Sequence, residues 1–144
     1  MEHQEGVSPV EAIATRVRAA RQRKGLTAQQ LAGKVGWDRA TVTKLETGRR
    51  QNVTVDEWLA LARALDVAPI HLLVPLENGG AYRVTSDESV PTERARYWIR
   101  GIVPLSGTDD RIFRTEVPVA ELRAWDTEEG NADGEQEHQE APER

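Results

Sequence analysis

Residues 26–50, LTAQQLAGKVGWDRATVTKLETGRR, decide the fold of this chain. They predict two short helices joined by a tight turn at Gly36, because glycine most easily adopts the left-handed conformation that closes a helix. Thr27 is followed three positions later by Gln30, which is the pattern of a capping box at the start of the first helix. Asp38 is the expected N-cap of the second helix. The segment therefore predicts a helix, a tight turn and a second helix.

Three further helices are expected around this pair. The segments SPVE at residues 8–11 and TVDE at residues 54–57 are capping boxes, and each starts a helix. Ala68–Pro69 starts a short fifth helix, with proline at its first position. Apolar residues recur at helical spacing and are the expected core: Ile13, Val17, Ala20, Leu31, Ala32, Val35, Val42, Leu45, Trp58, Leu61, Ala62 and Leu65. Together they predict an all-α domain over residues 8–76.

The rest of the chain has a different character. Asn78-Gly79-Gly80 marks a boundary, so we expect a linker at residues 77–81 and a small α+β region at residues 82–126. Within that region the pattern predicts strands at 82–85 and 112–117 and helices at 91–100 and 118–125. Residues 127–144 lack an apolar anchor and residues 1–7 are largely acidic and polar, so both segments are expected to be disordered. The region at 82–126 is too small for an independent core, so it is expected to pack on the helical domain or on a second copy.

Composition excludes several classes of function. The chain has 144 residues and no cysteine, so disulfides, cysteine-ligated zinc and thiol catalysis are excluded. It has no apolar run of the roughly 20 residues that cross a bilayer, and its acidic N-terminus is unlike a secretory signal. We therefore expect a cytoplasmic protein without membrane contact.

The acidic net charge of −5 is distributed unevenly. Residues 10–75 hold eleven Lys or Arg residues against six Asp or Glu residues, a net charge of +5. Residues 127–144 hold one against seven, a net charge of −6. The basic excess therefore lies in the helical domain, where binding to nucleic-acid phosphates would need it.

Residues of about 10–75 resemble the Cro/repressor-type helix-turn-helix domains of bacterial and phage regulators, the XRE family. The resemblance rests on Arg21, Gly25-Leu26-Thr27, Leu31-Ala32, Val35-Gly36, Val42, Leu45-Glu46, Gly48 and the helix end at residues 61–67. It implies a mainly α fold: a five-helix lambda-repressor-like DNA-binding domain, followed here by a small α+β appendage and a disordered acidic tail. It also implies a sequence-specific transcriptional regulator, a repressor that binds double-stranded operator DNA as a homodimer, with no cofactor, no metal and no enzymatic activity.

The same resemblance implies roles for individual residues. The helix at about 39–47 is expected to enter the major groove, and its outward residues are the expected base contacts: Arg39, Ala40, Thr43 and Lys44. The expected phosphate contacts are Thr27, Gln29, Thr41, Arg49 and Arg50. Arg21 and Glu46 are expected to form a structural ion pair between the first and third helices, although Arg21 alone could be taken for a DNA contact.

Two positions depart from the family pattern. Ala28 stands where relatives often have a glutamine, which puts one expected side-chain contact in doubt. Trp37 occupies the turn, where a small polar residue is more common. Its side chain either packs against the turn or contacts a sugar edge or a thymine methyl group.

Two alternatives to a simple regulator stay open. In an antitoxin, or in an adaptor that has lost DNA binding, residues 82–144 would bind a partner protein. The cations at positions 39, 44, 49 and 50 favour DNA, because an adaptor has no need of four cations on one surface. The sequence carries no phosphate-binding glycine loop, nucleophile elbow or paired-histidine motif, and so no enzyme is predicted.

Overall fold

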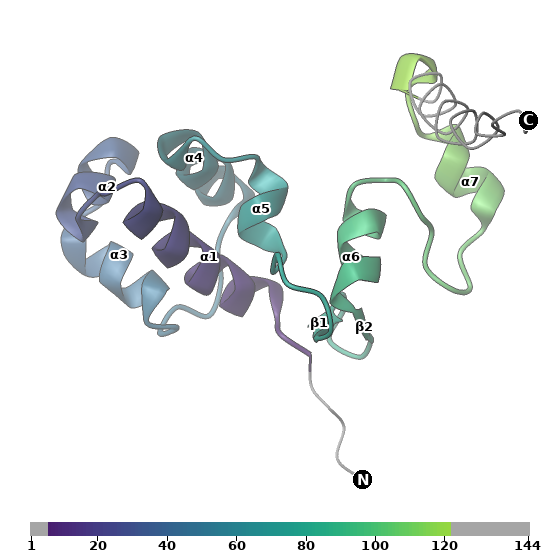
Figure 1. Ribbon diagram of the computed structural model, residues 1–144, viewed down its shortest axis with the longest axis horizontal. Helices are drawn as coiled ribbons and strands as arrows, with labels where there is room; N and C mark the ends of the chain where they lie inside the picture. Colours follow the sequence, from purple (N-terminus) through teal and green to yellow (C-terminus); the bar gives the residue numbers. More distant parts are fainter. Residues whose placement is uncertain (1–5, 122–144) are drawn as a thin grey trace, which may run out of the picture. The chain divides into compact units, whose positions relative to one another are not determined.

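Helices dominate residues 6–121, the part of the chain that the computed structural model describes (Figure 1). The elements in chain order are α1 (Pro9–Arg23), α2 (Ala28–Val35), α3 (Arg39–Glu46), α4 (Val55–Leu65), α5 (Pro69–Leu73), β1 (Ala81–Arg83), β2 (Ser89–Pro91), α6 (Thr92–Ile99) and α7 (Asp110–Thr115). The mainly α class is confirmed, and α1 to α5 are the five predicted helices. Our predictions for residues 1–5 and 122–144 lie outside the described residues.

Local capping sets the starts of α1, α2 and α4. All three predicted capping boxes are formed, with bonds in both directions between the N-cap and the third helical residue: Ser8–Glu11, Thr27–Gln30 and Thr54–Glu57. Each N-cap side chain contributes about 1 kcal/mol of helix stability. Gly36 closes α2 in the left-handed conformation, with φ of 73°. Short-range chemistry therefore explains where these helices begin and where α2 ends.

The first core lies among α1 to α5. Its buried residues are Ile13, Val17, Ala20, Leu31, Ala32, Val42, Leu45, Leu61, Ala62, Leu65 and Leu72. Trp37 and Trp58 are half-buried and pack against it. The Trp58 indole N–H also donates to the carbonyl of Pro69 at 2.8 Å, which ties α4 to the start of α5. This core holds α2 and α3 against α1.

A second, smaller core attaches the appendage to α1. The strands β1 and β2 form an antiparallel hairpin in which Tyr82 pairs with Val90. Tyr82 is buried together with Ala12 of α1, Val74 and Ala95 of α6. Its hydroxyl donates to the carbonyl of Leu73 at 2.9 Å, and burial raises the pKa of Tyr82 to about 12. Residues 81–99 therefore pack on the helical domain, within a compact unit that ends at Val103.

Val7, two residues before α1, pairs with β1 beside this second core. We expected disorder through residue 7, but Val7 pairs in parallel with Tyr82. The Val7 N–H donates to the carbonyl of Ala81, and the Arg83 N–H donates to the carbonyl of Val7, both at 2.9 Å. The sequence gives no sign of this pairing, because one apolar residue before a helix has no periodicity.

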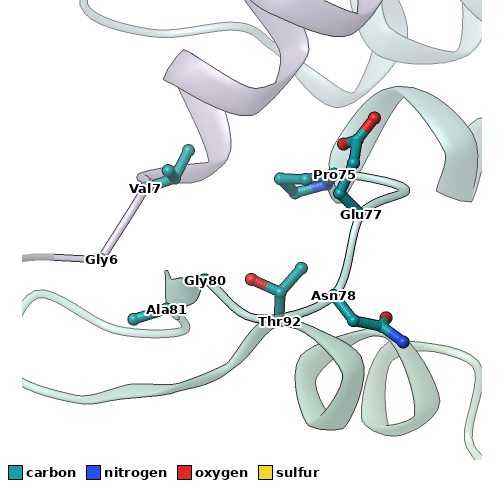
Figure 2. Close-up of a pocket in the computed structure, with 8 residues that line it drawn as sticks. All are labelled: Gly6, Val7, Pro75, Glu77, Asn78, Gly80, Ala81 and Thr92. Carbon is teal, nitrogen blue, oxygen red and sulfur yellow. The ribbon is translucent and has the colours of Figure 1, made fainter.

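Gly6 should be intolerant of any side chain. A Cβ atom there would lie 2.9 Å from the carbonyl carbon of Ala81 and 2.9 Å from the backbone nitrogen of Tyr82. Figure 2 shows Gly6 and Val7 on one side of a pocket, opposite Pro75 and Glu77. Since both clashes are with backbone, Gly6→Ala should lower the free energy of unfolding by about 2 kcal/mol.

Gly33 provides the matched control. It lies inside α2, and a Cβ atom built there meets nothing within 4 Å. Gly33→Ala should therefore raise the free energy of unfolding by about 0.5–1 kcal/mol, because alanine costs less backbone entropy in a helix. Urea unfolding of both variants checks the pair. Equal effects of the two substitutions would contradict the close approach at Gly6.

Residues 104–121 belong to a second unit, and here one prediction is wrong. Residues 112–117 alternate like a strand, yet Asp110–Thr115 is the helix α7. Asp109 caps this helix by accepting from the N–H groups of Arg111 and Ile112, and Arg114 pairs with Asp110 one turn away at 3.1 Å. A strand needs a neighbour, whereas these contacts are local, and so the helix forms. Residues 119–121 are also helical, and the remainder of the helix predicted at 118–125 lies outside the described residues.

Candidate functional site

The turn between α2 and α3 is fixed by backbone hydrogen bonds and by a cap. The N–H groups of Gly36 and Trp37 both donate to the carbonyl of Ala32, the latter at 2.9 Å. Asp38 then accepts from the N–H of Thr41 at 2.8 Å and starts α3. Because each bond uses a defined backbone group, the direction in which α3 leaves the turn is defined.

One face of α3 carries the residues that we expected to contact bases. Arg39, Ala40 and Lys44 are exposed, and Thr43 is half-buried. Positions 39, 40, 43 and 44 lie on one side of a helix with 3.6 residues per turn, opposite the buried Val42 and Leu45. Within residues 6–121, no ion pair involves Arg39 or Lys44. Their charges are therefore available to an anion or to base edges.

Thr41, an expected phosphate contact, has a bond inside the protein. Its hydroxyl donates to Asp38 Oδ1 at 2.7 Å, and the same oxygen accepts from the Thr41 N–H. These two bonds hold the pKa of Asp38 below its ordinary value. The Thr41 hydroxyl could donate a hydrogen bond to a phosphate only if it first gave up its hydrogen bond to Asp38.

The start of α2 supplies N–H groups of the kind that bind phosphate. Within the capping box, Gln30 Oε1 accepts from the Thr27 N–H at 2.9 Å, and Thr27 Oγ1 accepts from the Gln30 N–H at 3.1 Å. The N–H groups of Ala28 and Gln29 are in the first turn of the helix, where no carbonyl within the helix can accept from them. Thr27 and Gln29 are exposed, so this end of α2 can donate to an anion.

Arg49 and Arg50 follow α3 but have different surroundings. Arg49 is exposed, and its Nε donates to Thr47 Oγ1 at 3.2 Å. Arg50 donates through Nη1 and Nη2 to the two carboxylate oxygens of Glu57, both at 2.9 Å. Its guanidinium also lies over the Trp37 ring, 5.3 Å from the ring centre. Only 17% of the Arg50 side chain is exposed, and the Glu57 carboxylate already compensates its charge.

The sequence did not indicate this cluster of Trp37, Arg50 and Glu57. Glu57 was identified only as the third residue of a capping box, and Trp37 only as an unusual residue in the turn. The available signal was an aromatic residue in the turn, Trp37, and a carboxylate at the start of the next helix, Glu57, because either group can bind the guanidinium of an arginine. The half-buried Trp37 packs against the turn and the core, as the first of its two interpretations requires.

Arg21 and Glu46 form a bidentate ion pair between α1 and α3. Arg21 Nε donates to Glu46 Oε1 at 2.6 Å, and Nη2 donates to Oε2 at 3.0 Å. Nη1 of Arg21 also donates to the carbonyl of Leu26 at 2.8 Å. The side chains are 14% and 7% exposed, and the hydrogen bond to Glu46 raises the pKa of Arg21. The pair holds the end of α3 against α1 and neutralises a carboxylate beside the α3 face.

A pocket of about 370 Å³ lies elsewhere, between the N-terminal segment and the start of α6 (Figure 2). The Thr92 side chain points into it, and its eight lining residues include one charged group, Glu77. Among the described residues, no group of three His, Cys, Asp or Glu side chains could hold a metal ion. The stronger candidate site is therefore the basic surface made by the start of α2, the α3 face and Arg49.

Within residues 6–121, no helix is both long enough and apolar enough to cross a membrane.

Comparison with known proteins identifies the same part of the chain. Residues 12–73 match the model of a family described as a helix-turn-helix domain. The restriction-modification controller protein C.AhdI from Aeromonas hydrophila is 40% identical over 44% of this chain and 94% of that chain, with a TM-score of 0.41. The hypothetical transcription factor NHTF from Neisseria is 30% identical over 53% of this chain and 86% of that chain, with a TM-score of 0.46. No curated protein matches this chain.

Proposed function

This chain belongs to the Cro/repressor-type helix-turn-helix family, and from this premise we propose that it is a sequence-specific DNA-binding transcriptional regulator that acts as a repressor. In this proposal α3 enters the major groove, and the start of α2 and Arg49 contact the phosphate backbone on either side. The proposal includes no catalytic step and no cofactor. The function would be carried out in the cytoplasm, where operator DNA is accessible.

The exposed α3 face is the observation that supports this proposal most strongly. Arg39 can donate two bonds to guanine O6 and N7, and Ala40 and the Thr43 methyl group can contact a thymine methyl group. Lys44, farther along the helix, can reach a base edge or a phosphate. Within the described residues neither cation has a carboxylate partner that DNA would have to displace.

A homodimer is part of the proposal. One α3 offers only four outward positions to the bases, which is too few to select a single operator in a genome. Two copies bound to two related half-sites would double the contacts, with the half-sites about one helical turn, or about 34 Å, apart. The operator should therefore be a palindrome or a repeat.

Selection of bound sequences from a random pool of duplex DNA tests this function. We expect enrichment of one motif present twice, with its two copies about 10 base pairs apart from centre to centre. The double variant Arg39→Ala, Lys44→Ala should enrich no motif. The control Arg63→Ala, Arg94→Ala removes two exposed cations from α4 and α6 and should enrich the same motif as the parent. A pool that stays random with the parent protein would contradict the proposed function.

A further inference from the structure

Arg50 has a different role from its neighbour Arg49, and the difference has consequences for how this surface binds DNA. We propose that Arg50 is a positioning residue that fixes the segment between α3 and α4 against Trp37, so that Arg49 lies where it can bind a phosphate, while Arg50 itself does not contact DNA. This inference rests on the proposed function. It replaces the expectation from the sequence that both arginines neutralise phosphates.

The Trp37–Arg50–Glu57 cluster is fixed at its carboxylate end. Glu57 Oε1 accepts from Arg50 Nη2 and also from the backbone N–H of Thr54, both at 2.9 Å. The Thr54 hydroxyl in turn accepts from the Glu57 N–H at 3.1 Å. Because the same carboxylate caps α4, it cannot follow Arg50 towards another anion without breaking the cap. Arg50 is the main cause that holds the pKa of Glu57 below its ordinary value.

The cluster is also fixed at its aromatic end. The guanidinium lies 5.3 Å from the centre of the Trp37 ring, within the range of a cation–π interaction. Trp37 belongs to the turn between α2 and α3, so Arg50 links that turn to the start of α4. This link gives the unusual tryptophan of the turn a physical role, because a small polar residue would present no ring to the guanidinium.

Transfer of Arg50 to a phosphate would bring little net gain. The guanidinium would exchange one anion for another and would lose the ring. It would also leave the Glu57 carboxylate without its partner close to the DNA, and an uncompensated, partly buried charge is costly. Arg49 has no such competitor among the described residues, since its only side-chain bond is to the Thr47 hydroxyl. The phosphate contact therefore falls to Arg49.

The substitution Glu57→Gln distinguishes a positioning role from a phosphate contact by the sign of its effect. The glutamine oxygen can still accept from Thr54 and cap α4, but the ion pair with Arg50 is lost. If Arg50 only positions Arg49, Glu57→Gln should weaken binding to the selected DNA. If Arg50 is a phosphate ligand restrained by Glu57, the substitution should release it and strengthen binding.

Asp56→Asn is the matched control. Asp56 is the exposed neighbour of Glu57 on α4, and within residues 6–121 it forms no ion pair. The two substitutions change the net charge by the same amount, and only Glu57→Gln removes the ion pair with Arg50. We expect Glu57→Gln to bind about fivefold more weakly than Asp56→Asn, which is equivalent to about 1 kcal/mol. Because a displaced Arg49 neutralises its phosphate less well, the slope of log affinity against log salt concentration should be no steeper for Glu57→Gln than for Asp56→Asn.

Arg49→Ala completes the experiment. It should reduce the magnitude of the salt slope by about 0.9, the loss of one phosphate contact. The positioning role would be overturned if Glu57→Gln bound the selected DNA at least as tightly as Asp56→Asn does. It would also be overturned if the salt slope of Glu57→Gln were steeper than that of Asp56→Asn. A parent protein with no salt-dependent binding would instead count against the proposed function. Circular dichroism and an unfolding curve of each variant show whether it is folded, so that weaker binding by an unfolded variant is not taken for a displaced Arg49.

Discussion

Replacing Arg21 by alanine should lower the free energy of unfolding by about 3 kcal/mol. The substitution leaves the carboxylate of Glu46, whose side chain is only 7% exposed, without its bidentate partner. It also removes the donor to the carbonyl of Leu26. The cost is larger than the net contribution of the pair, because a partly buried charge that loses its partner keeps its desolvation penalty.

Arg23→Ala is the control for this prediction. Arg23 is an exposed residue in the last turn of the same helix, and no ion pair within residues 6–121 involves it. Its replacement should change the free energy of unfolding by less than about 0.5 kcal/mol. The pair raises the pKa of Arg21, so the contribution of its charge is complete at neutral pH and would be lost only in strong alkali. The measurement is urea unfolding of both variants at pH 7. Equal decreases in the free energy of unfolding would show that the Arg21–Glu46 pair does not hold α3 against α1.

Replacing Arg39 by alanine should relax the preference for one base pair of the selected operator by about 1–3 kcal/mol, or about 5- to 150-fold. Arg39 is the first residue of α3 and is exposed, so its bidentate donor is expected to reach guanine O6 and N7. The measurement is the affinity of the parent and the variant for the operator and for the three substitutions at each base pair. Preference at the other positions should be retained.

Arg63→Ala is the control for Arg39→Ala, since its side chain is 89% exposed and lies on α4. It should leave the preference at every position unchanged. A loss of affinity with Arg39→Ala that is equal for all sequences would indicate a phosphate contact. That result would contradict the base contact assigned to Arg39.

Features that depend on neighbours in sequence could be predicted. The three capping boxes, the left-handed Gly36 and the apolar stripes of α1 to α4 are short-range patterns, and the structure has them, with Val35 and Trp58 half-buried against the core. The exposed positions of α3 followed from the same periodicity once Val42 and Leu45 were identified as its buried side. Local chemistry therefore accounts for α1 to α5 and for the residues that the α3 face exposes.

Features that depend on distant partners could not be predicted in the same way. Val7 pairs with a strand more than 70 residues away, and its own neighbourhood gives no sign of it. Arg50 was expected to contact a phosphate, because a sequence does not show that the Trp37 ring and the Glu57 carboxylate both lie against its guanidinium. The strand predicted at 112–117 failed for a related reason, since alternation cannot create the neighbour that a strand needs.

Recognition of DNA by the α3 face can be measured as the affinity of the full chain for its selected operator between about 50 and 200 mM salt. Arg39, Lys44 and Arg49 are the exposed cations assigned to DNA, and each phosphate neutralised contributes about 0.9 to the slope of log affinity against log salt concentration. We predict a linear decrease whose slope becomes smaller in magnitude by about 0.9 with Arg49→Ala and does not change with Arg63→Ala. Binding that is independent of salt, or equal for the operator and for unrelated DNA, would show that this surface is not a sequence-specific DNA-binding site.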